Sequence, residues 1–462
     1  MAYDIPKSVS PGSPDGPSAG KRLRIAVIGT GISGLSAAWA LSKAHDVTLF
    51  EQDDRPGGHA NTVDIKIDGQ LVSVDTGFIV YNAANYPNLV ALFDHLDVET
   101  AASDMSFGAS LRGGDSEYSG QTLNSVFATR SNTINPRFWR MLIDVTRFHR
   151  LARRALDRGI DDDMRLGDFI RTHRLSTAFT TDFIGPMAGA IWSTPSASVL
   201  DYPARSFIQF YANHGLLQVL NMPLWRTVAG GSRHYVQKML DDFRGSLRLA
   251  TPVSRVAPAD DGTVITTTAA GQRDVFGKCV IATHGDQARA MLQSPGDPRD
   301  GVLGAFRYQP NRAVLHLDKT AMPRRRAAWS AWNVIETGDD LCVTYWMNKL
   351  QSLATDRDVF VTLNPPQPLE NILGQWDYAH PLYDLDVYRA QRDIWAHQGT
   401  DNIWFAGAHL GAGFHEDGLQ AGLKIAEAIS GTARPWQVAN ASGRLNLERF
   451  AGADHSRAIE GS

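Results

Sequence analysis

Apolar and polar positions along the first fifty residues alternate in a way that predicts a strand, a helix and a second strand. Leu23 to Ile28 is a short, β-branched apolar run of the kind found in buried strands. Ile32 to Ala44 has helical periodicity with small residues on one face, and Val47 to Phe50 is apolar again. This order predicts a βαβ unit, whose crossover we expect to be right-handed.

The remaining chain mixes strand and helix patterns in an order that indicates two interleaved domains. Alternating positions on either side of Asp68–Gly69 predict a β-hairpin, and Gly113–Gly114 marks a second one. From Pro136 to about Leu220 the periodicity is helical, and strand patterns return between Ser246 and Thr283. A last strand and helix run from Asn402 to Ile429. We therefore expect a nucleotide-binding domain that is interrupted twice by a second domain.

Composition and charge are those of an ordinary globular enzyme. Hydrophobic residues make up 43 % and charged residues 20 % of the 462 positions, and the net charge of −4 would not attract nucleic acid. Residues 1–20 are rich in Pro, Gly and Ser and lack the apolar run of a signal peptide, so we expect a disordered tail. No apolar stretch of about twenty residues could span a membrane. We expect a cytoplasmic protein and leave peripheral membrane contact open.

A glycine-rich turn joins the first strand to the first helix. It matches the pattern G-x-G-x-x-G through three residues: Gly29, Gly31 and Gly34. In this pattern the glycines permit a tight turn, a close approach of the backbone to a pyrophosphate, and close helix–strand packing. Ile32 and Ser33 begin the helix, so their free N–H groups face the phosphates. The turn therefore predicts a dinucleotide site. The two cysteines, Cys279 and Cys342, suggest neither a disulfide framework nor a metal site, and we expect no metal.

The residues after the second strand favour FAD over NAD. Glu51 ends that strand and is placed to accept hydrogen bonds from ribose hydroxyls. Arg55, Gly57 and Gly58 follow, and the paired glycines let the chain pass close beside an extended ligand. An NAD domain would continue with another βα unit, whereas this chain enters a hairpin that ends at Asp75–Gly77.

Together these motifs resemble the flavin-containing amine oxidase-like superfamily. Its successive motifs, G-x-G-x-x-G, E-x-x-x-R-x-G-G, D-x-G and a late glycine-rich βα segment, correspond to Gly29–Gly34, Glu51–Gly58, Asp75–Gly77 and Trp404–Gly422. The resemblance implies an α/β fold in which a Rossmann-like FAD-binding domain, a parallel sheet with a β-hairpin insertion, is interleaved with a mixed α+β substrate domain. The FAD-binding domain would comprise residues 21–100, 225–300 and 400–435, the substrate or cap domain residues 101–224 and 301–399, and a C-terminal tail residues 436–462.

The resemblance also implies why a phosphate-type helix start occurs near the end of the chain. In this family the C-terminal segment returns to the first domain and covers the flavin. The helix start from Phe414 to Gly418 would point at the isoalloxazine and ribityl region, where its positive end would stabilise the anionic reduced flavin. Val253 matches the family position that contacts adenine through its backbone, and we expect Gly77 and Gly407 at the cofactor as well.

Some positions depart from the family pattern. The usual G-D before the last helix is Gly407–Ala408, so a carboxylate contact to the cofactor is missing, and Asp417 is the candidate to replace it. His59 follows the paired glycines where many relatives have arginine, and we expect it to be a polar contact near the cofactor. No cysteine lies near the C-terminal segment, so covalent thioether attachment of the flavin is not supported.

The substrate is suggested only by the resemblance. A single complete G-x-G-x-x-G favours a flavin that is reduced by its substrate and reoxidised by oxygen, a quinone or a partner protein, with redox-neutral isomerisation as an alternative. The C-terminal segment, Ser330–Asn333 and Thr344–Gln351 resemble a branch whose members are often encoded beside cyclopropane-fatty-acyl-phospholipid synthases. That association implies hydride transfer between the flavin and a long acyl chain, unsaturated or methyl-modified, as a fatty acid or within a phospholipid.

Two basic segments are compatible with a lipid substrate. Seven arginines lie between Arg137 and Arg158, where apolar residues from Phe138 to Leu151 recur at helical spacing. Such a helix can lie on an anionic lipid surface, or its apolar face can belong to the core. The segment Arg324–Arg326 with Trp329 and Trp332 has the same two interpretations.

The candidate catalytic residues lie in three different segments. Tyr81 follows the D-x-G hairpin and is placed to reach the substrate face of the flavin. His415 and Glu416 lie on the C-terminal turn, where either is a candidate general base or a residue that holds the loop. His284 follows a strand and is a candidate for catalysis or for capping a helix. Transfer of hydride to the flavin can also proceed without a strong base, by orientation and exclusion of water.

Two other functions remain open at this point. An amine or amino-acid oxidase would benefit from a lysine near the reactive flavin nitrogen and from an aromatic cage, and Lys319 and Lys349 are the lysines available. A lipid-group escort protein of the same fold would have no redox activity. The colour of the purified protein and its bleaching by substrate distinguish the escort protein from either enzyme.

Overall fold

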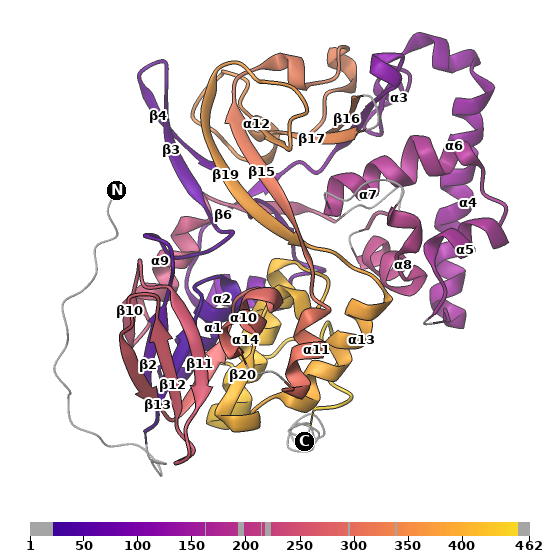
Figure 1. Cartoon of the computed structure of the whole chain (residues 1–462). Helices are drawn as coiled ribbons and strands as arrows, with labels where there is room; N and C mark the ends of the chain where they lie inside the picture. The colour runs from indigo at the N-terminus through magenta and orange to yellow at the C-terminus, as the bar shows by residue number, and fades with distance from the viewer. Residues whose placement is uncertain are drawn as a thin grey trace.

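The structure, a computed structural model, describes residues 22–161, 163–192, 198–213, 215–217, 223–293, 296–337 and 340–450. The tail predicted for residues 1–20 lies outside them. The chain forms two lobes: a five-stranded sheet lies in one, a seven-stranded sheet lies in the other, and a group of helices stands beside the second (Figure 1). No helix among the described residues combines the length and the apolar character needed to cross a bilayer.

The five-stranded sheet is wholly parallel and confirms the predicted α/β fold. Its strands, in spatial order, are β10 (Ser246–Arg248), β2 (Asp46–Phe50), β1 (Arg24–Ile28), β14 (Lys278–Ile281) and β20 (Ile403–Phe405). Three distant parts of the chain therefore build one sheet, as the interrupted order of the sequence pattern indicates. The helices of this lobe include α1 (Ile32–Leu41), α2 (Pro87–His95), α9 (Arg233–Asp241), α10 (Gly285–Leu292), α11 (Pro298–Gly304), α13 (Leu385–Asp393) and α14 (His415–Ser430).

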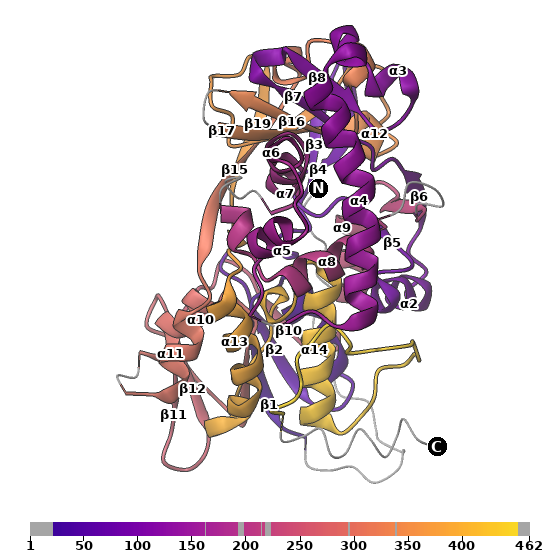
Figure 2. The same cartoon turned by 90° about the vertical axis from the view of Figure 1, so that its right-hand side faces the viewer.

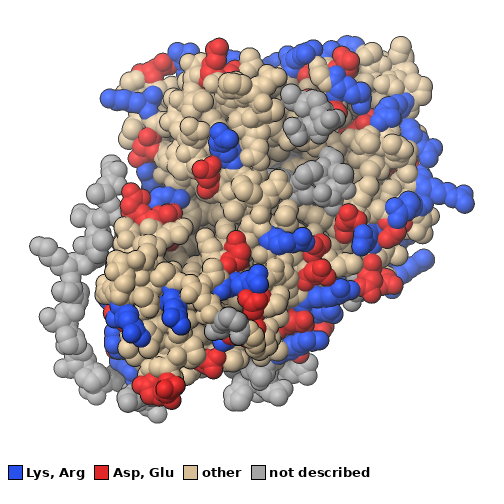
Figure 3. Space-filling view, viewed as in Figure 1, with Lys and Arg blue, Asp and Glu red and all other residues tan. Residues whose placement is uncertain are grey.

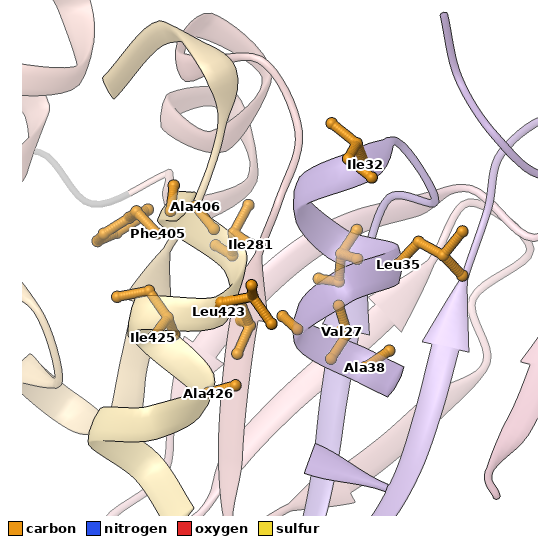
Figure 4. Close-up of a cluster of buried hydrophobic side chains, with 14 of the residues drawn as sticks. Val27, Ile32, Leu35, Ala38, Ile281, Phe405, Ala406, Leu423, Ile425 and Ala426 are labelled. Atoms are coloured by element: carbon orange, nitrogen blue, oxygen red, sulfur yellow. The ribbon is translucent and has the colours of Figure 1, made fainter. Parts of the chain in front are cut away.

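Helices α1 and α14 cross at small residues, so the starts of the first and last helices lie side by side. A Cβ atom on Gly422 would stand 2.1 Å from the carbonyl oxygen of Ser33, and one on Gly418 would stand 2.8 Å from Cγ2 of Ile32. Apolar side chains of both helices, including Leu35 and Leu423, pack over the parallel sheet (Figure 4). Glycine is required at this crossing because a side chain would separate the two helices.

The second lobe contains a large mixed sheet. Its strands, in spatial order, are β19 (Ile372–Pro381), β15 (Tyr308–His316), β18 (Phe360–Leu363), β17 (Asp340–Trp346), β16 (Trp332–Thr337), β7 (Phe107–Leu111) and β8 (Ser116–Ser119). The long strands β15 and β19 run from this sheet down to the first lobe (Figure 1). The short helices α3 (Leu123–Val126) and α12 (Met347–Leu350) lie at its periphery.

Smaller sheets complete the two lobes. Both predicted hairpins are present, β3 (Thr62–Ile67) with β4 (Gln70–Asp75), and β7 with β8. The other short strands are β5 (Tyr81–Asn82), β9 (Trp225–Val228) and β6 (Thr100–Ser103) in one sheet, and β11 (Val253–Pro258), β12 (Val264–Thr268) and β13 (Arg273–Phe276) in another. The sequence pattern therefore located the hairpins correctly.

The helical group has its own apolar core. It comprises α4 (Pro136–Arg158), α5 (Leu166–Thr172), α6 (Thr177–Phe179), α7 (Gly185–Trp192) and α8 (Ala204–Asn213) (Figure 2). The apolar face of α4 is buried through Phe138, Met141 and Phe148, so this face belongs to the core and not to a lipid surface. Trp329 is likewise buried, with the guanidinium of Arg326 3.8 Å from its ring centroid, so the second basic segment is not a lipid surface either.

The segment predicted as a C-terminal tail packs on the first lobe as far as residue 450. Trp436 stacks on Trp39 with ring centroids 6.0 Å apart. Arg444 pairs with the buried carboxylate of Asp417 at 3.4 Å. The chain thus continues to cover the last helix after that helix ends.

Candidate functional site

A cavity of about 970 Å³ runs from the glycine-rich turn of the first lobe to the side chains of the second lobe. Its lining includes twelve of the residues predicted to bind the cofactor: Gly29, Gly31, Ile32, Ser33, Glu51, Arg55, Gly58, His59, Gly77, Val253, Gly407 and Phe414. The turn of α1 and the turn of α14 therefore face one elongated space. Their adjacency agrees with the expectation that the two ends of the folded chain meet around a single ligand.

The three glycines of the first turn have different structural roles. Gly29 has a φ of +99°, which disfavours any other residue, and a Cβ atom on Gly34 would stand 1.9 Å from the carbonyl oxygen of Gly29. A Cβ atom on Gly31 would meet nothing within 4 Å. Gly29 and Gly34 are thus required by the protein itself, whereas the open space beside Gly31 is part of the cavity. This is the arrangement that a pyrophosphate beside the backbone requires.

Glu51 faces the cavity and also holds the loop that follows it. Its buried carboxylate accepts hydrogen bonds from the Thr30 backbone N–H at 2.9 Å, from the Asp53 backbone N–H at 3.1 Å and from the Thr30 hydroxyl. The same hydroxyl accepts a hydrogen bond from the Gly57 backbone N–H at 3.1 Å. Glu51 therefore ties the glycine-rich turn to the paired-glycine loop, a role that its position at a strand end did not reveal.

The paired-glycine loop lies directly on the first turn. A Cβ atom on Gly58 would stand 3.1 Å from the Cα of Gly31, and one on Gly57 would stand 2.8 Å from the carbonyl oxygen of Ala60. The Arg55 guanidinium donates to the carbonyl oxygen of Gly58 at 2.9 Å. Gly57 thus shapes the loop without lining the cavity, whereas Gly58 and Arg55 are part of the lining.

Asp417 does not replace the missing carboxylate contact. It lies outside the cavity lining, where its carboxylate accepts the Phe414 backbone N–H at 2.8 Å and pairs with Arg444. The Asp417 carboxylate therefore caps the start of α14. Its negative charge partly neutralises the positive end of the helix dipole, which we expected to face a flavin. Gly418 also lies outside the lining, because it is occupied by the crossing with α1.

Two of the four catalytic candidates lie outside the cavity lining. Tyr81 is buried, and its ring packs edge-on against Phe93 with centroids 5.3 Å apart. Glu416 is fully buried and accepts hydrogen bonds from the backbone N–H groups of Asn88 at 3.1 Å and Leu89 at 3.0 Å, so it caps the start of α2. Burial also raises the pKa of Glu416 above its usual value. Neither residue lines the cavity, so the structure gives catalysis by them no support.

The third candidate, His415, does line the cavity. Its Nε2 atom lies 2.8 Å from the Tyr235 hydroxyl, and its ring stacks on Phe78 with centroids 3.7 Å apart. Burial lowers the pKa of His415 to about 3. The imidazole is therefore neutral at neutral pH and offers a hydrogen-bonding group without a charge.

His415 is one of five histidines in the lining: His59, His284, His380, His409 and His415. Burial is the largest cause that lowers the pKa of each, to about 4 for His380 and to about 3 for His409. His284 precedes α10 and stacks on Tyr308 with centroids 4.2 Å apart. No group of side chains in the described ranges has the arrangement of a metal site. Sequence reasoning missed His380, which lies in no recognisable motif, and His409, which lies inside the late glycine-rich segment but was not singled out.

Away from the glycine-rich turns most of the cavity lining is apolar, and the charged residue that β19 adds to the lining, Asp377, is exposed. We call the apolar part of the cavity the apolar chamber and define it by these lining residues: Phe78, Ile79, Val80, Met105, Phe107, Met187, Phe210, Leu216, Trp225, Trp332 and Tyr345. Among the described lining residues there is no lysine, and Arg55 at the opposite end is the one arginine. Lys319 and Lys349 lie elsewhere, paired with Asp358 at 2.8 Å and Asp104 at 3.0 Å.

Two hydrogen-bond donors in the lining were also missed. The Tyr383 hydroxyl and the Trp332 indole nitrogen are buried and find no partner among the described residues. Tyr383 lies against the C-terminal turn, because a Cβ atom on Gly413 would stand 2.6 Å from its hydroxyl oxygen. Buried donors without a partner are rare in folded proteins, so both are available to a ligand. No sequence motif marks Tyr383, and Trp332 was noted only as part of Ser330–Asn333 and of a basic segment.

Comparisons with known proteins agree with this geometry. A family model for flavin-containing amine oxidoreductases matches residues 32–317. The solved structure of wild-type putrescine oxidase bound to putrescine superposes with a TM-score of 0.65 at 16 % identity, over 89 % of this chain and 99 % of that one. A CLA-producing fatty acid isomerase from P. acnes gives 0.62 at 14 % identity, over 89 % and 99 %. A putative protoporphyrinogen oxidase from Exiguobacterium sp. 255-15 gives 0.60 at 14 %, over the same shares.

Proposed function

Because the chain belongs to the family of flavin-containing amine oxidoreductases, we propose that this FAD-dependent oxidoreductase acts on a long, apolar acyl chain. The family establishes the cofactor and the class of enzyme. The single observation that carries the choice of substrate is the apolar chamber; among the described lining residues outside the predicted cofactor site, Asp377 is the one charged group, and it is exposed.

The residues present fit the cofactor along the length of the cavity. The open space beside Gly31 suits a pyrophosphate, and the carboxylate of Glu51 suits ribose hydroxyls. Val253 would border the adenine, and the turn that contains Phe414 would border the isoalloxazine together with Gly77. Such a placement leaves the apolar chamber for the substrate.

When bound, FAD would supply a two-electron acceptor for a hydride from a substrate C–H bond; the neighbouring carbon would release a proton to water, and dioxygen or a quinone would take the electrons from the reduced cofactor. The contribution of the chain's own residues is to orient the substrate and to exclude water. Aromatic and aliphatic side chains of the chamber would hold an acyl chain by burial alone. Because burial lowers the pKa of His415 to about 3, its neutral imidazole is a weak base and would orient the ligand through a hydrogen bond.

Structural likeness to solved enzymes does not select the substrate, since the putrescine oxidase and the fatty acid isomerase share this fold equally well. The residues that line the cavity do distinguish an amine substrate from an acyl chain. A cationic amine held among the apolar side chains would lose its hydration without a paired charge, since Glu51 and Asp53 belong to the predicted cofactor site and Asp377 is exposed. The apolar part of a fatty acyl chain carries no charge, so its burial in the chamber would remove no comparable hydration. An amine oxidase therefore stays the second candidate, and Lys319 and Lys349 give it no support.

The proposal is tested by the colour of the enzyme. Purified yellow protein is mixed anaerobically with unsaturated fatty acids, free or esterified in phospholipid, and the flavin absorbance is followed; a panel of amines and amino acids is run in parallel with detection of peroxide in air. We expect bleaching or isomerised product with a lipid and no peroxide with the amines. Peroxide formed from an amine, without bleaching or isomerised product from a lipid, would contradict the acyl substrate, and colourless protein would favour an escort protein.

A further inference from the structure

Exposed apolar side chains gather at one place on the helical side of the molecule. Eight large apolar side chains are exposed in the described residues, and four of them belong to one stretch of chain: Leu123, Ile134, Trp139 and Ile143. Leu123 and Ile134 are 81 % and 84 % exposed, more than any of the others except Leu224. We call these four residues the α3–α4 surface.

These four side chains form one surface although they come from different elements. The ring of Phe127, which follows α3, packs against Trp139 of α4 with centroids 5.5 Å apart. The Trp139 indole donates to the carbonyl oxygen of Thr133 at 2.8 Å, which holds the turn that carries Ile134. Ile143 lies one helical turn after Trp139 on the same face. The surface is thus fixed by internal contacts and keeps its apolar groups outside.

Positive charge continues along the same face of α4. Between residues 121 and 159 there are eight arginines against two aspartates, and three of these arginines, Arg137, Arg140 and Arg147, are paired with Asp182 or Asp144. Arg150 and Arg154 follow Trp139 at helical spacing and are exposed, and neither makes an ion pair within the described part of the chain. One of the two aspartates, Asp144, is buried and paired with Arg140 at 3.1 Å. Blue atoms accordingly gather along the right-hand margin of Figure 3, where α4 to α6 lie in Figure 1.

We propose that the α3–α4 surface docks on an anionic lipid bilayer, with Leu123, Ile134, Trp139 and Ile143 in the acyl boundary and the arginines of α4 at the lipid phosphates. Aliphatic side chains that project this far, with an indole beside them, match the apolar and interfacial regions of a bilayer. The unpaired arginines complement its negative surface. This surface differs from the apolar face of α4, which is buried in the core.

Docking here would place the cavity close to lipid. Phe148 of α4 packs edge-on against Tyr211 of α8 with centroids 6.1 Å apart, and the neighbouring Phe210 belongs to the apolar chamber. The helical wall of the chamber therefore stands directly behind the docking surface. The docking itself does not depend on which substrate the enzyme uses, so vesicle binding and turnover can fail independently.

The test is vesicle flotation of the full-length, FAD-loaded protein. Vesicles of pure phosphatidylcholine are compared with vesicles that contain phosphatidylcholine and phosphatidylglycerol in equal parts. The double variant L123S/I134S removes two side chains that make little contact with the protein, so its melting temperature should not change. The matched control L71S/I372S alters two exposed apolar residues elsewhere, which are 60 % and 48 % exposed.

We expect the wild-type protein and L71S/I372S to float with the anionic vesicles, and L123S/I134S to bind at least about tenfold more weakly. The charge variant R150E/R154E should lose binding, whereas R255E/R273E, which alters exposed arginines of the first lobe, should retain it. Added salt should weaken binding of the wild type. Failure of the wild type to float, or equal flotation of L123S/I134S, would overturn the proposal. So would a self-dimer or a complex with an acidic protein that forms without vesicles and is lost in L123S/I134S.

Discussion

The two ends of the cavity are built in different ways. The nucleotide end is made of backbone: the turn at Gly29–Gly34, the paired-glycine loop beside it, and a carboxylate, Glu51, that ties them together. The apolar chamber is made of side chains that come from strands and helices more than two hundred residues apart. At the first end an added methyl group collides with the protein or fills the cavity, whereas at the second end one apolar side chain can replace another.

This difference between the two ends suits the two ligands that we expect there, the cofactor and the substrate. A site formed by backbone atoms has little freedom to change, which suits a ligand that is the same in every turnover. A site formed by side chains can alter its shape by substitution without disturbing the fold. The contrast explains how putrescine oxidase and a fatty acid isomerase can share one fold, and the predictions below test each end separately.

The largest effect should follow a substitution at the nucleotide end. Gly31→Val should fold, because its side chain enters open space, yet it should purify without FAD because that space is needed by the pyrophosphate. Gly34→Ala is the matched comparison and should fold poorly, because its Cβ would stand 1.9 Å from a backbone oxygen. Absorbance at the flavin band and circular dichroism distinguish the two results. Fully yellow Gly31→Val protein would disprove the placement of the cofactor.

A charge in the apolar chamber should affect the substrate alone. Met105 is only half-buried, so Met105→Lys should fold, but its ammonium would lie where an acyl chain has to bind. We expect kcat/KM for the acyl substrate to fall about 100-fold, or roughly 2–3 kcal/mol, at an unchanged ratio of FAD to protein. Met105→Leu serves as the control and should stay near wild type. Loss of FAD from Met105→Lys would mean that the two ends are not independent.

Removing the carboxylate of Glu51 should weaken the cofactor without abolishing it. Glu51→Ala deletes a charged acceptor for ribose hydroxyls and also the contacts to Thr30 and Asp53. The FAD dissociation constant should rise by an amount equivalent to about 1–3 kcal/mol, with a smaller rise for Glu51→Gln, which keeps one oxygen. Titration of the apoprotein with FAD measures both. An unchanged dissociation constant would show that Glu51 serves the loop only.

The hydroxyl of Tyr383 offers a smaller test at the border between the two ends. Because this hydroxyl has no partner among the described residues, Tyr383→Phe should leave the melting temperature the same or slightly higher. If the hydroxyl donates to a ligand, kcat/KM should fall roughly fivefold, which corresponds to a free-energy difference of about 1 kcal/mol. A lower melting temperature with unchanged kinetics would assign Tyr383 a structural role.

The buried imidazole of His409 should make stability depend on pH. Its pKa is about 3 in the folded protein and about 6.5 in an exposed chain, so the unfolded state binds the extra proton between these values. The free energy of unfolding should therefore fall as the pH drops below 6.5, by roughly 1–2 kcal/mol at about pH 5 from this residue. Urea unfolding of His409→Gln should show a correspondingly shallower decline. If the free energy of unfolding declined equally with falling pH in both proteins, the lowered pKa of His409 would be contradicted.

The sequence was informative where one local motif determines the geometry. The βαβ unit, the Asp68–Gly69 hairpin and the last βα segment follow from short-range periodicity and turn chemistry, and the structure has all of them. The meeting of the two helix starts at Gly418 and Gly422 could be expected only from the family resemblance, because no local pattern brings residues so distant in the chain together.

The sequence was misleading where a polar residue has a partner far along the chain. Glu416 and Asp417 resemble site residues because they sit on a glycine-rich turn, yet they are occupied by the start of α2 and by Arg444. Tyr383 and His380 reach the cavity because β19 is long enough to run from one lobe to the other. Such partners and paths depend on tertiary packing, which periodicity does not encode.

The crossing of α1 with α14 has a consequence for biosynthesis. Helix α1 is synthesised long before α14, whose Gly418 and Gly422 pack against it beside the predicted cofactor site. We therefore expect a nascent chain to leave the apolar surface of α1 uncovered until α14 has been made, and to bind the cofactor only after that.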